Sequence, residues 1–194
     1  MTSLDRSVPH FIDAIASENV TPAGITAAAV SGAIGAALLE MACIHSDTRE
    51  HARPLAPVET EFREHRERLL ALATADEQVV DDLFATSSSD PTDDEFKRVT
   101  SIPLSVASVC LSVLEAAELV ADECSSAVLA DAVGGAMLAK SALDASLYTV
   151  RYNGAFVSDR SFRNRTERRA DAIEHEASAR YETMRRTDPL DAFE

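Results

Sequence analysis

The sequence predicts an all-α protein, a helical bundle of about six helices with two buried helices rich in alanine and glycine. Two distant segments, 25–43 and 126–152, are rich in small apolar residues. A helix that is apolar on every side has no face suited to water, so both segments are expected inside the molecule. Aromatic residues make up only 5% of the chain and tryptophan is absent, which indicates an aliphatic core of closely packed helices.

The chain opens with an amphipathic helix expected over residues 4–17, whose apolar side chains recur at helical spacing. A turn over 19–24 ends it, because Pro22 disfavours a helical conformation at the residue before it. Gly24 can take a positive φ in this turn, because glycine meets no steric penalty there. The second helix covers 25–43, and small residues that let another backbone come close lie four apart on one face: Ala28, Gly32 and Ala36.

Apolar periodicity predicts four more helices, over residues 57–84, 93–123, 126–152 and 159–186. Polar, proline-containing loops are expected at 46–57 and 87–94, and a loose tail at 186–194. Pro103 is expected to kink or split its helix, because proline has no backbone N–H to donate. The pair Gly134–Gly135 indicates close helix packing. No segment reads as a strand, and residues 1–194 are expected to form one domain.

Two carboxylates on these helices have more than one interpretation. Asp76 falls on the apolar face of its helix, where an ionised group is costly. It is either a core carboxylate tied to a helix end or an arginine, or a carboxylate that faces an internal cleft. Asp131 either interacts with the positive N-terminal end of its helix or lies at the rim of a site. Arg151 near a helix C-terminus is ordinary for a cation by itself.

Charge limits the classes of partner. The chain has 33 acidic and 18 basic residues, a formal net charge of -15, which disfavours binding to nucleic acid. Lys97 and Lys140 are the only lysines. This near-absence of lysine beside so many acids suggests a halophilic protein, adapted to a salt-rich cytoplasm.

Membrane and metal partners are not expected either. Charged residues within 1–20 argue against a signal peptide. The apolar run 25–39 is shorter than the roughly 20 residues needed to span a bilayer, and Glu40 closes it. A cytoplasmic protein is therefore predicted. The three cysteines show no C-x-x-C spacing and the histidines no metal spacing, so we expect neither disulfides nor a metal.

Several segments, in order, resemble the cyclodeaminase/cyclohydrolase family, which includes the C-terminal domain of formiminotransferase-cyclodeaminase and stand-alone methenyltetrahydrofolate cyclohydrolases. Residues 11–17 resemble its opening helix, and 32–41 its second helix. Four shorter matches are TPAGITAAA (21–29) to its glycine-rich turn, IPLSVA (102–107) to its Val-Pro-Leu helix, AVLAD (127–131) to its Ala-Val-Ser-Asp segment, and TVRYN (149–153) to its Asn-Val-Arg-Ile-Asn ending.

The resemblance implies an all-α bundle that forms a homodimer, with a folate cleft associated with the dimer. It implies Asp131 and Asp76 as catalytic residues. The expected substrate-binding residues are Gly24, Thr26, His45, Arg151 and Asn153. The glycine-rich turn is reduced here to residues 23–26, and the family's lysine-bearing segment is replaced by 45–49.

The activity implied is hydrolysis of 5,10-methenyltetrahydrofolate to 10-formyltetrahydrofolate, with no separate cofactor. Water adds to a cationic amidinium carbon, so a buried carboxylate could stabilise the cation or accept the proton of the water. Two alternatives remain open. One is formiminotetrahydrofolate cyclodeamination, which releases ammonia. The other is a non-catalytic folate-binding or dimeric scaffold protein.

Overall fold

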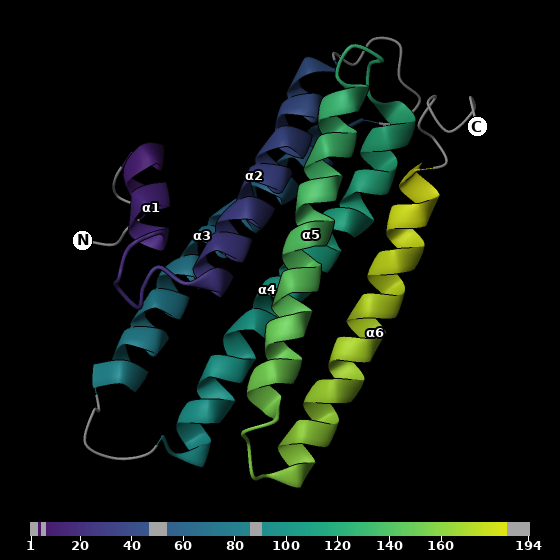
Figure 1. Ribbon diagram of the computed structural model, residues 1–194. Helices are drawn as coiled ribbons and strands as arrows, with labels where there is room; N and C mark the ends of the chain where they lie inside the picture. Colours follow the sequence, from purple (N-terminus) through teal and green to yellow (C-terminus); the bar gives the residue numbers. More distant parts are fainter. Residues whose placement is uncertain (1–3, 5–6, 47–53, 86–90, 186–194) are drawn as a thin grey trace.

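The computed structural model describes residues 4, 7–46, 54–85 and 91–185, and these contain six α-helices and no strand, which confirms the all-α prediction (Figure 1). The helices are α1 (Val8–Ile15), α2 (Gly24–His45), α3 (Ala56–Ala85), α4 (Asp93–Glu123), α5 (Leu129–Gly154) and α6 (Arg160–Arg185). Helix α2 packs on α3 and α5, α4 packs on α3 and α5, and α6 covers α4 and α5. The short α1 lies apart at the edge of the bundle (Figure 1).

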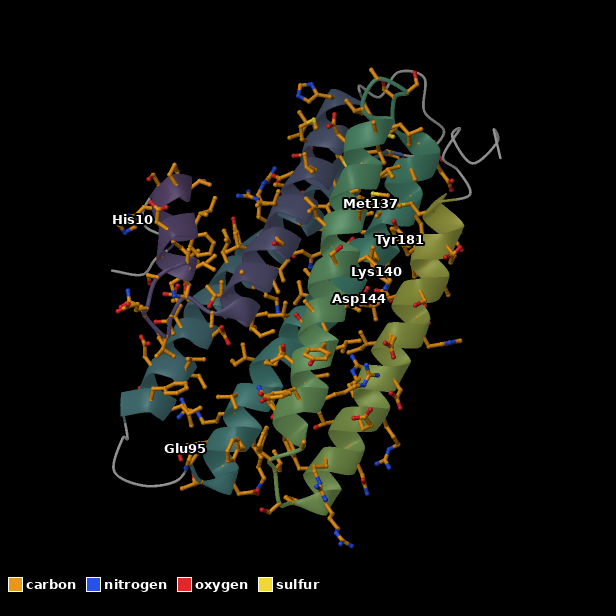
Figure 2. All side chains as sticks on the ribbon, viewed as in Figure 1. His10, Glu95, Met137, Lys140, Asp144 and Tyr181 are labelled. Atoms are coloured by element: carbon orange, nitrogen blue, oxygen red, sulfur yellow. The ribbon has the colours of Figure 1, made fainter. Side chains whose placement is uncertain are left out.

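Helix ends differ from the expectations by a few residues. Helix α1 is shorter than 4–17, and α5 begins at Leu129 rather than 126, because a turn precedes it in which Val128 N–H donates to the carbonyl of Ser125. A capping box opens α4, since the Glu95 carboxylate accepts from Thr92 N–H and the Thr92 hydroxyl accepts from Glu95 N–H (Figure 2 labels Glu95). Residues 47–53 of the expected loop 46–57, residues 87–90 of the expected loop 87–94, and the tail 186–194 lie outside the described residues.

Pro103 does not split its helix, because α4 runs without a break from Asp93 to Glu123. Of the two expected effects of Pro103, a kink or a split, the split is therefore excluded. The N–H that proline lacks would have donated to the carbonyl of Val99, four residues earlier. That carbonyl instead accepts from the side-chain amide of Asn153 on α5, at 2.9 Å. A bond from a neighbouring helix thus satisfies the carbonyl that proline leaves free.

The two small-residue helices are central, but neither is apolar and buried on every side as predicted. Ile34 on α2 is 51% exposed and Met137 on α5 is 48% exposed. Lys140 and Asp144 form an ion pair at 2.7 Å further along α5 (Figure 2). The reason is geometric, because each helix meets its neighbours over only part of its circumference.

The backbones of α2 and α5 meet at two glycines. A Cβ added to Gly35 would stand 2.5 Å from the carbonyl oxygen of Gly135, and one added to Gly135 would stand 2.7 Å from the carbonyl oxygen of Gly35. Gly32 is also tightly covered, by Cys110 of α4. Nothing lies within 4 Å of a Cβ at Gly134. Close packing is confirmed for Gly32 and Gly135, whereas Gly134 has no part in it.

By length and composition, helices α2 and α4 are long and apolar enough to cross a membrane. Of the most apolar stretch of each helix, 50% in α2 and 44% in α4 is buried inside the bundle. The length argument against a membrane span is therefore wrong, because the apolar run belongs to a helix of 22 residues. Core helices of soluble bundles have the same length and composition.

Candidate functional site

A cavity of about 320 Å³ lies at the end of the bundle where α2 begins and α5 ends. Residues of α2, α3, α4 and α5 line it, together with Ala23 and Phe156 at the helix ends. Asp76 is the only charged side chain among its described lining residues. A single buried carboxylate in an apolar and aromatic cavity is the kind of arrangement in which acid–base chemistry occurs.

Asp76 is held by the start of α2. The backbone N–H of Thr26 donates to Asp76 Oδ2 at 2.9 Å, and the Thr26 hydroxyl donates to the same oxygen at 2.8 Å. The first turn of α2 contains no acidic residue, so Asp76 supplies the negative charge that favours a helix N-terminus. The carboxylate is thus tied to a helix end and also faces a cavity, which combines the two interpretations of the sequence.

Burial dominates the electrostatics of Asp76, which is 6% exposed. Desolvation raises the pKa of this carboxyl above its ordinary value of 3.8, and the hydrogen bonds from Thr26 oppose the rise. The charge of Glu77 adds to it. A carboxylate with a raised pKa is a better proton acceptor than an exposed one.

Gly24 lines the cavity as the first residue of α2. None of the described glycines has a positive φ, so Gly24 does not use the left-handed conformation that is open to glycine. The helix begins directly at this residue, which makes that conformation unnecessary. A Cβ at Gly24 would meet nothing within 4 Å. The backbone is therefore open to the cavity at this position.

Aromatic side chains gather around the carboxylate. The chain has seven Phe, three Tyr and no Trp, and four of these ten line the cavity: Phe84, Phe96, Tyr152 and Phe156. The rings of Phe96 and Phe156 stack with their centres 5.5 Å apart, and Tyr152 meets Phe156 edge-on. Such faces suit a flat heteroaromatic ring. The sequence reasoning missed this cluster, although the concentration of scarce aromatics near the helix ends was a usable signal.

Asn153 lines the same cavity, but its amide nitrogen is engaged with Val99. Its side-chain oxygen and its second amide hydrogen have no partner among the described residues, so both can interact with a ligand. The residue therefore ties α5 to α4 beside the cavity, a role that only the missing N–H of Pro103 explains.

Asp131 and His45 lie at the opposite end of the bundle. Asp131 is exposed in the first turn of α5, about 33 Å from Asn153 at 1.5 Å per residue. His45 ends α2, about 32 Å from Gly24. The expectation that Asp131 and Asp76 surround one ligand is wrong within a single subunit. Helix order contained the signal, because in an up-and-down bundle the start of α5 cannot adjoin the start of α2.

Arg151 is also placed differently from the expectation. Its guanidinium binds three carboxylates of α6, those of Glu167 at 3.1 Å, Asp171 at 2.9 Å and Glu174 at 2.8 Å. It does not line the Asp76 cavity. Arg151 thus links α5 to α6, and its charge is already paired with carboxylates rather than available to an anionic ligand.

In the described part of the chain, the cysteines and the larger cavity offer no competing site. Burial raises the pKa of the Cys43 and Cys110 thiols to about 12, which keeps them protonated. Among the described residues no three His, Cys, Asp or Glu side chains converge as metal ligands. A larger cavity of about 680 Å³ between α1, α2 and α3 has only the hydroxyls of Ser31 and Thr74 as polar side chains. It lacks a group for acid–base chemistry.

The sequence and fold match known proteins over nearly their whole length. The family model described as formiminotransferase-cyclodeaminase matches residues 7–172. A methenyltetrahydrofolate cyclohydrolase from Methylorubrum extorquens is 28% identical, covering 94% of this chain and 96% of the relative. The crystal structure of formiminotetrahydrofolate cyclodeaminase from Thermotoga maritima superimposes with a TM-score of 0.88 at 21% identity, over 95% of this chain and 96% of the other. At that identity the structural match shows the fold alone.

Proposed function

The chain belongs to the formiminotransferase-cyclodeaminase family, and from this premise we propose that it is a methenyltetrahydrofolate cyclohydrolase. The relative from Methylorubrum extorquens, which aligns with 94% of this chain, supports the choice of reaction. The observation that carries the chemistry is the buried Asp76, which lines an aromatic cavity and whose Oδ1 accepts no hydrogen bond from the described residues. The substrate is 5,10-methenyltetrahydrofolate and the product 10-formyltetrahydrofolate.

In the proposed mechanism Asp76 acts as the general base. Water adds to the methenyl carbon between N5 and N10, and Asp76 takes the proton that the water loses. The same carboxyl then returns the proton to N5 as the bond between that carbon and N5 breaks. The hydroxyl of the adduct loses its own proton to solvent as the C=O bond forms, so the formyl group is left on N10 and one proton is released overall. Before the water adds, the negative charge of Asp76 also favours the cationic bridge of the substrate.

The cavity suits the ring end of this substrate. A volume of about 320 Å³ is at the low end for small-molecule sites, so it holds the pteridine ring while the rest of the folate extends outward. The stacked pair Phe96 and Phe156 offers a ring face, and the open backbone at Gly24 leaves room beside it. The oxygen of Asn153 is a further acceptor for ring N–H groups.

Cyclodeamination is the second candidate, favoured by the name of the structural relative from Thermotoga maritima. In that reaction N10 attacks a formimino carbon and ammonia leaves, so the same carboxylate would move the protons. Ammonia release from formiminotetrahydrofolate, measured with the same preparation, separates the two reactions.

We also propose a cytoplasmic homodimer without a separate cofactor, in keeping with the halophilic composition. The apolar side chains exposed on α1 and α2, such as Val8, Ile12 and Ile34, support a homodimer. A role for Asp131 or His45 in the reaction requires that a second subunit bring them to the Asp76 cavity. Light scattering between low and molar salt tests the assembly and its salt dependence together.

The decisive experiment follows methenyltetrahydrofolate absorbance with wild-type protein, Asp76→Asn and Asp131→Asn. The two variants remove the same charge, one from the cavity and one from the exposed far end. We expect the wild type to exceed the spontaneous rate, and Asp76→Asn to lose roughly 10²–10⁴-fold in kcat. Asp131→Asn should keep the wild-type rate if the site lies within one subunit.

The pH profile of kcat/KM provides a second readout. Because burial raises the pKa of Asp76, activity should fall on the acid side at a pH above 3.8. A wild type no faster than buffer would refute the enzymatic function and leave the scaffold alternative. An active Asp76→Asn would refute this choice of base.

A further inference from the structure

We propose that Thr26 is a positioning residue, which fixes the orientation of the Asp76 carboxylate so that one chosen oxygen faces the cavity. The sequence resemblance suggested instead that Thr26 contacts the substrate. The residue is completely buried and does not line the cavity, so direct contact with the ligand is not available to it. This inference deepens the proposed function and rests on it.

The geometry is asymmetric between the two carboxylate oxygens. Both donors of Thr26, its N–H at 2.9 Å and its hydroxyl at 2.8 Å, end on Asp76 Oδ2. Within the described part of the chain, Oδ1 has no hydrogen-bond partner that competes with a ligand. Rotation about the terminal torsion of an aspartate is soft, so without these bonds the two oxygens would exchange. Two donors on one oxygen hold Oδ1 toward the cavity.

The direction of the Thr26 hydroxyl is itself unusual in this protein. Several other buried or half-buried helical hydroxyls, those of Thr100, Ser108 and Ser146, donate to the carbonyl four residues earlier. Thr26 is at the third position of α2, and its hydroxyl leaves its own helix to reach α3. The bond therefore serves Asp76 rather than the local helix.

These two bonds also oppose the effect of burial. They favour the ionised carboxylate against desolvation and against the charge of Glu77 on the same helix. Among the cavity-lining residues of α2, α4 and α5, Tyr152 is the only other titratable group. Thr26 is thus the neighbour whose hydrogen bonds favour the charged form of Asp76. A general base held in one orientation and in its ionised form needs no rearrangement before it accepts a proton.

The test compares Thr26→Val, which removes only the hydroxyl bond, with Thr26→Ser, which retains it. We expect Thr26→Val to lose roughly 10- to 100-fold in kcat with little change in KM, because a hydrogen bond to a charged group is lost. The acid limb of its pH–activity profile should move to higher pH. Thr26→Ser should restore both, and circular dichroism should show both variants folded.

Two controls keep the test independent of the proposed function. In an Asp76→Asn background the Thr26→Val change should have little further effect on the residual rate, because the two residues act as one unit. NMR titration of the Asp76 carboxyl carbon without folate should show a higher pKa in Thr26→Val. If the wild type is inactive but Thr26→Val still raises the pKa of the Asp76 carboxyl, the cyclohydrolase function is refuted and the positioning role is supported. An unchanged pKa and unchanged kcat in Thr26→Val would overturn the inference.

Discussion

The close contact of α2 and α5 at Gly35 and Gly135 predicts that Gly135→Ala and Gly134→Ala have opposite effects on stability. A Cβ at Gly135 would stand 2.7 Å from the carbonyl oxygen of Gly35 and 3.1 Å from the Cβ of Leu38. The obstacle is backbone, so it cannot be relieved by a side-chain rotation. At Gly134, the next residue of the same helix, the new methyl group meets nothing within 4 Å.

The magnitude follows from two opposing terms. Replacing glycine by alanine in a helix interior stabilises by about 1 kcal/mol, and this gain is common to both positions. At Gly135 the helices must separate by roughly 0.7 Å to restore ordinary contact, and overpacking of this kind costs about 1–3 kcal/mol. Because the obstacle is a carbonyl, we expect the upper half of that range. Gly135→Ala should then unfold about 2–3 kcal/mol more easily than Gly134→Ala.

Thermal and urea denaturation followed by circular dichroism measures this difference directly. For a chain of 194 residues, 1 kcal/mol corresponds to about 2–4 °C in Tm, so the two variants should differ by about 4–12 °C. Equal protein concentrations are needed, because assembly also shifts apparent stability. Melting of the two variants within about 2 °C of each other would refute the reasoning from backbone contact.

Two further substitutions test the cavity and its frame. Asn153→Ala should destabilise by about 1–3 kcal/mol because it leaves the Val99 carbonyl unsatisfied. In a Pro103→Ala background alanine supplies the missing N–H, so the cost of Asn153→Ala should shrink, and equal costs in both backgrounds would contradict the pairing. Gly24→Ala should leave the unfolding free energy unchanged or slightly higher, since its Cβ meets open space. Its KM for methenyltetrahydrofolate should nevertheless rise, and an unchanged KM would show that the substrate does not approach this backbone.

The amino-acid sequence alone determined the helices, because their signals are local. Apolar residues at helical spacing and the turn residues between them predicted six helices within a few residues of their observed ends. Asp76 stood out for the same reason, as a carboxylate placed where the periodicity required an apolar residue. The small residues of α2 and α5 likewise predicted that two helix backbones come close together, as Gly35 and Gly135 do.

Only the tertiary structure decided which helix ends share a site, because that depends on the direction in which each helix crosses the bundle. The sequence analysis predicted both Asp131 and Asp76 as catalytic residues, yet the antiparallel arrangement of the helices puts them at opposite ends of the bundle. The same arrangement lets Arg151 form ion pairs with acidic residues of α6. It also lets Asn153 donate a hydrogen bond to the backbone carbonyl that Pro103 leaves without a donor. Periodicity reports which side of a helix faces inward. Which residue it meets there is fixed by contacts between different helices, such as that of Thr26 with Asp76.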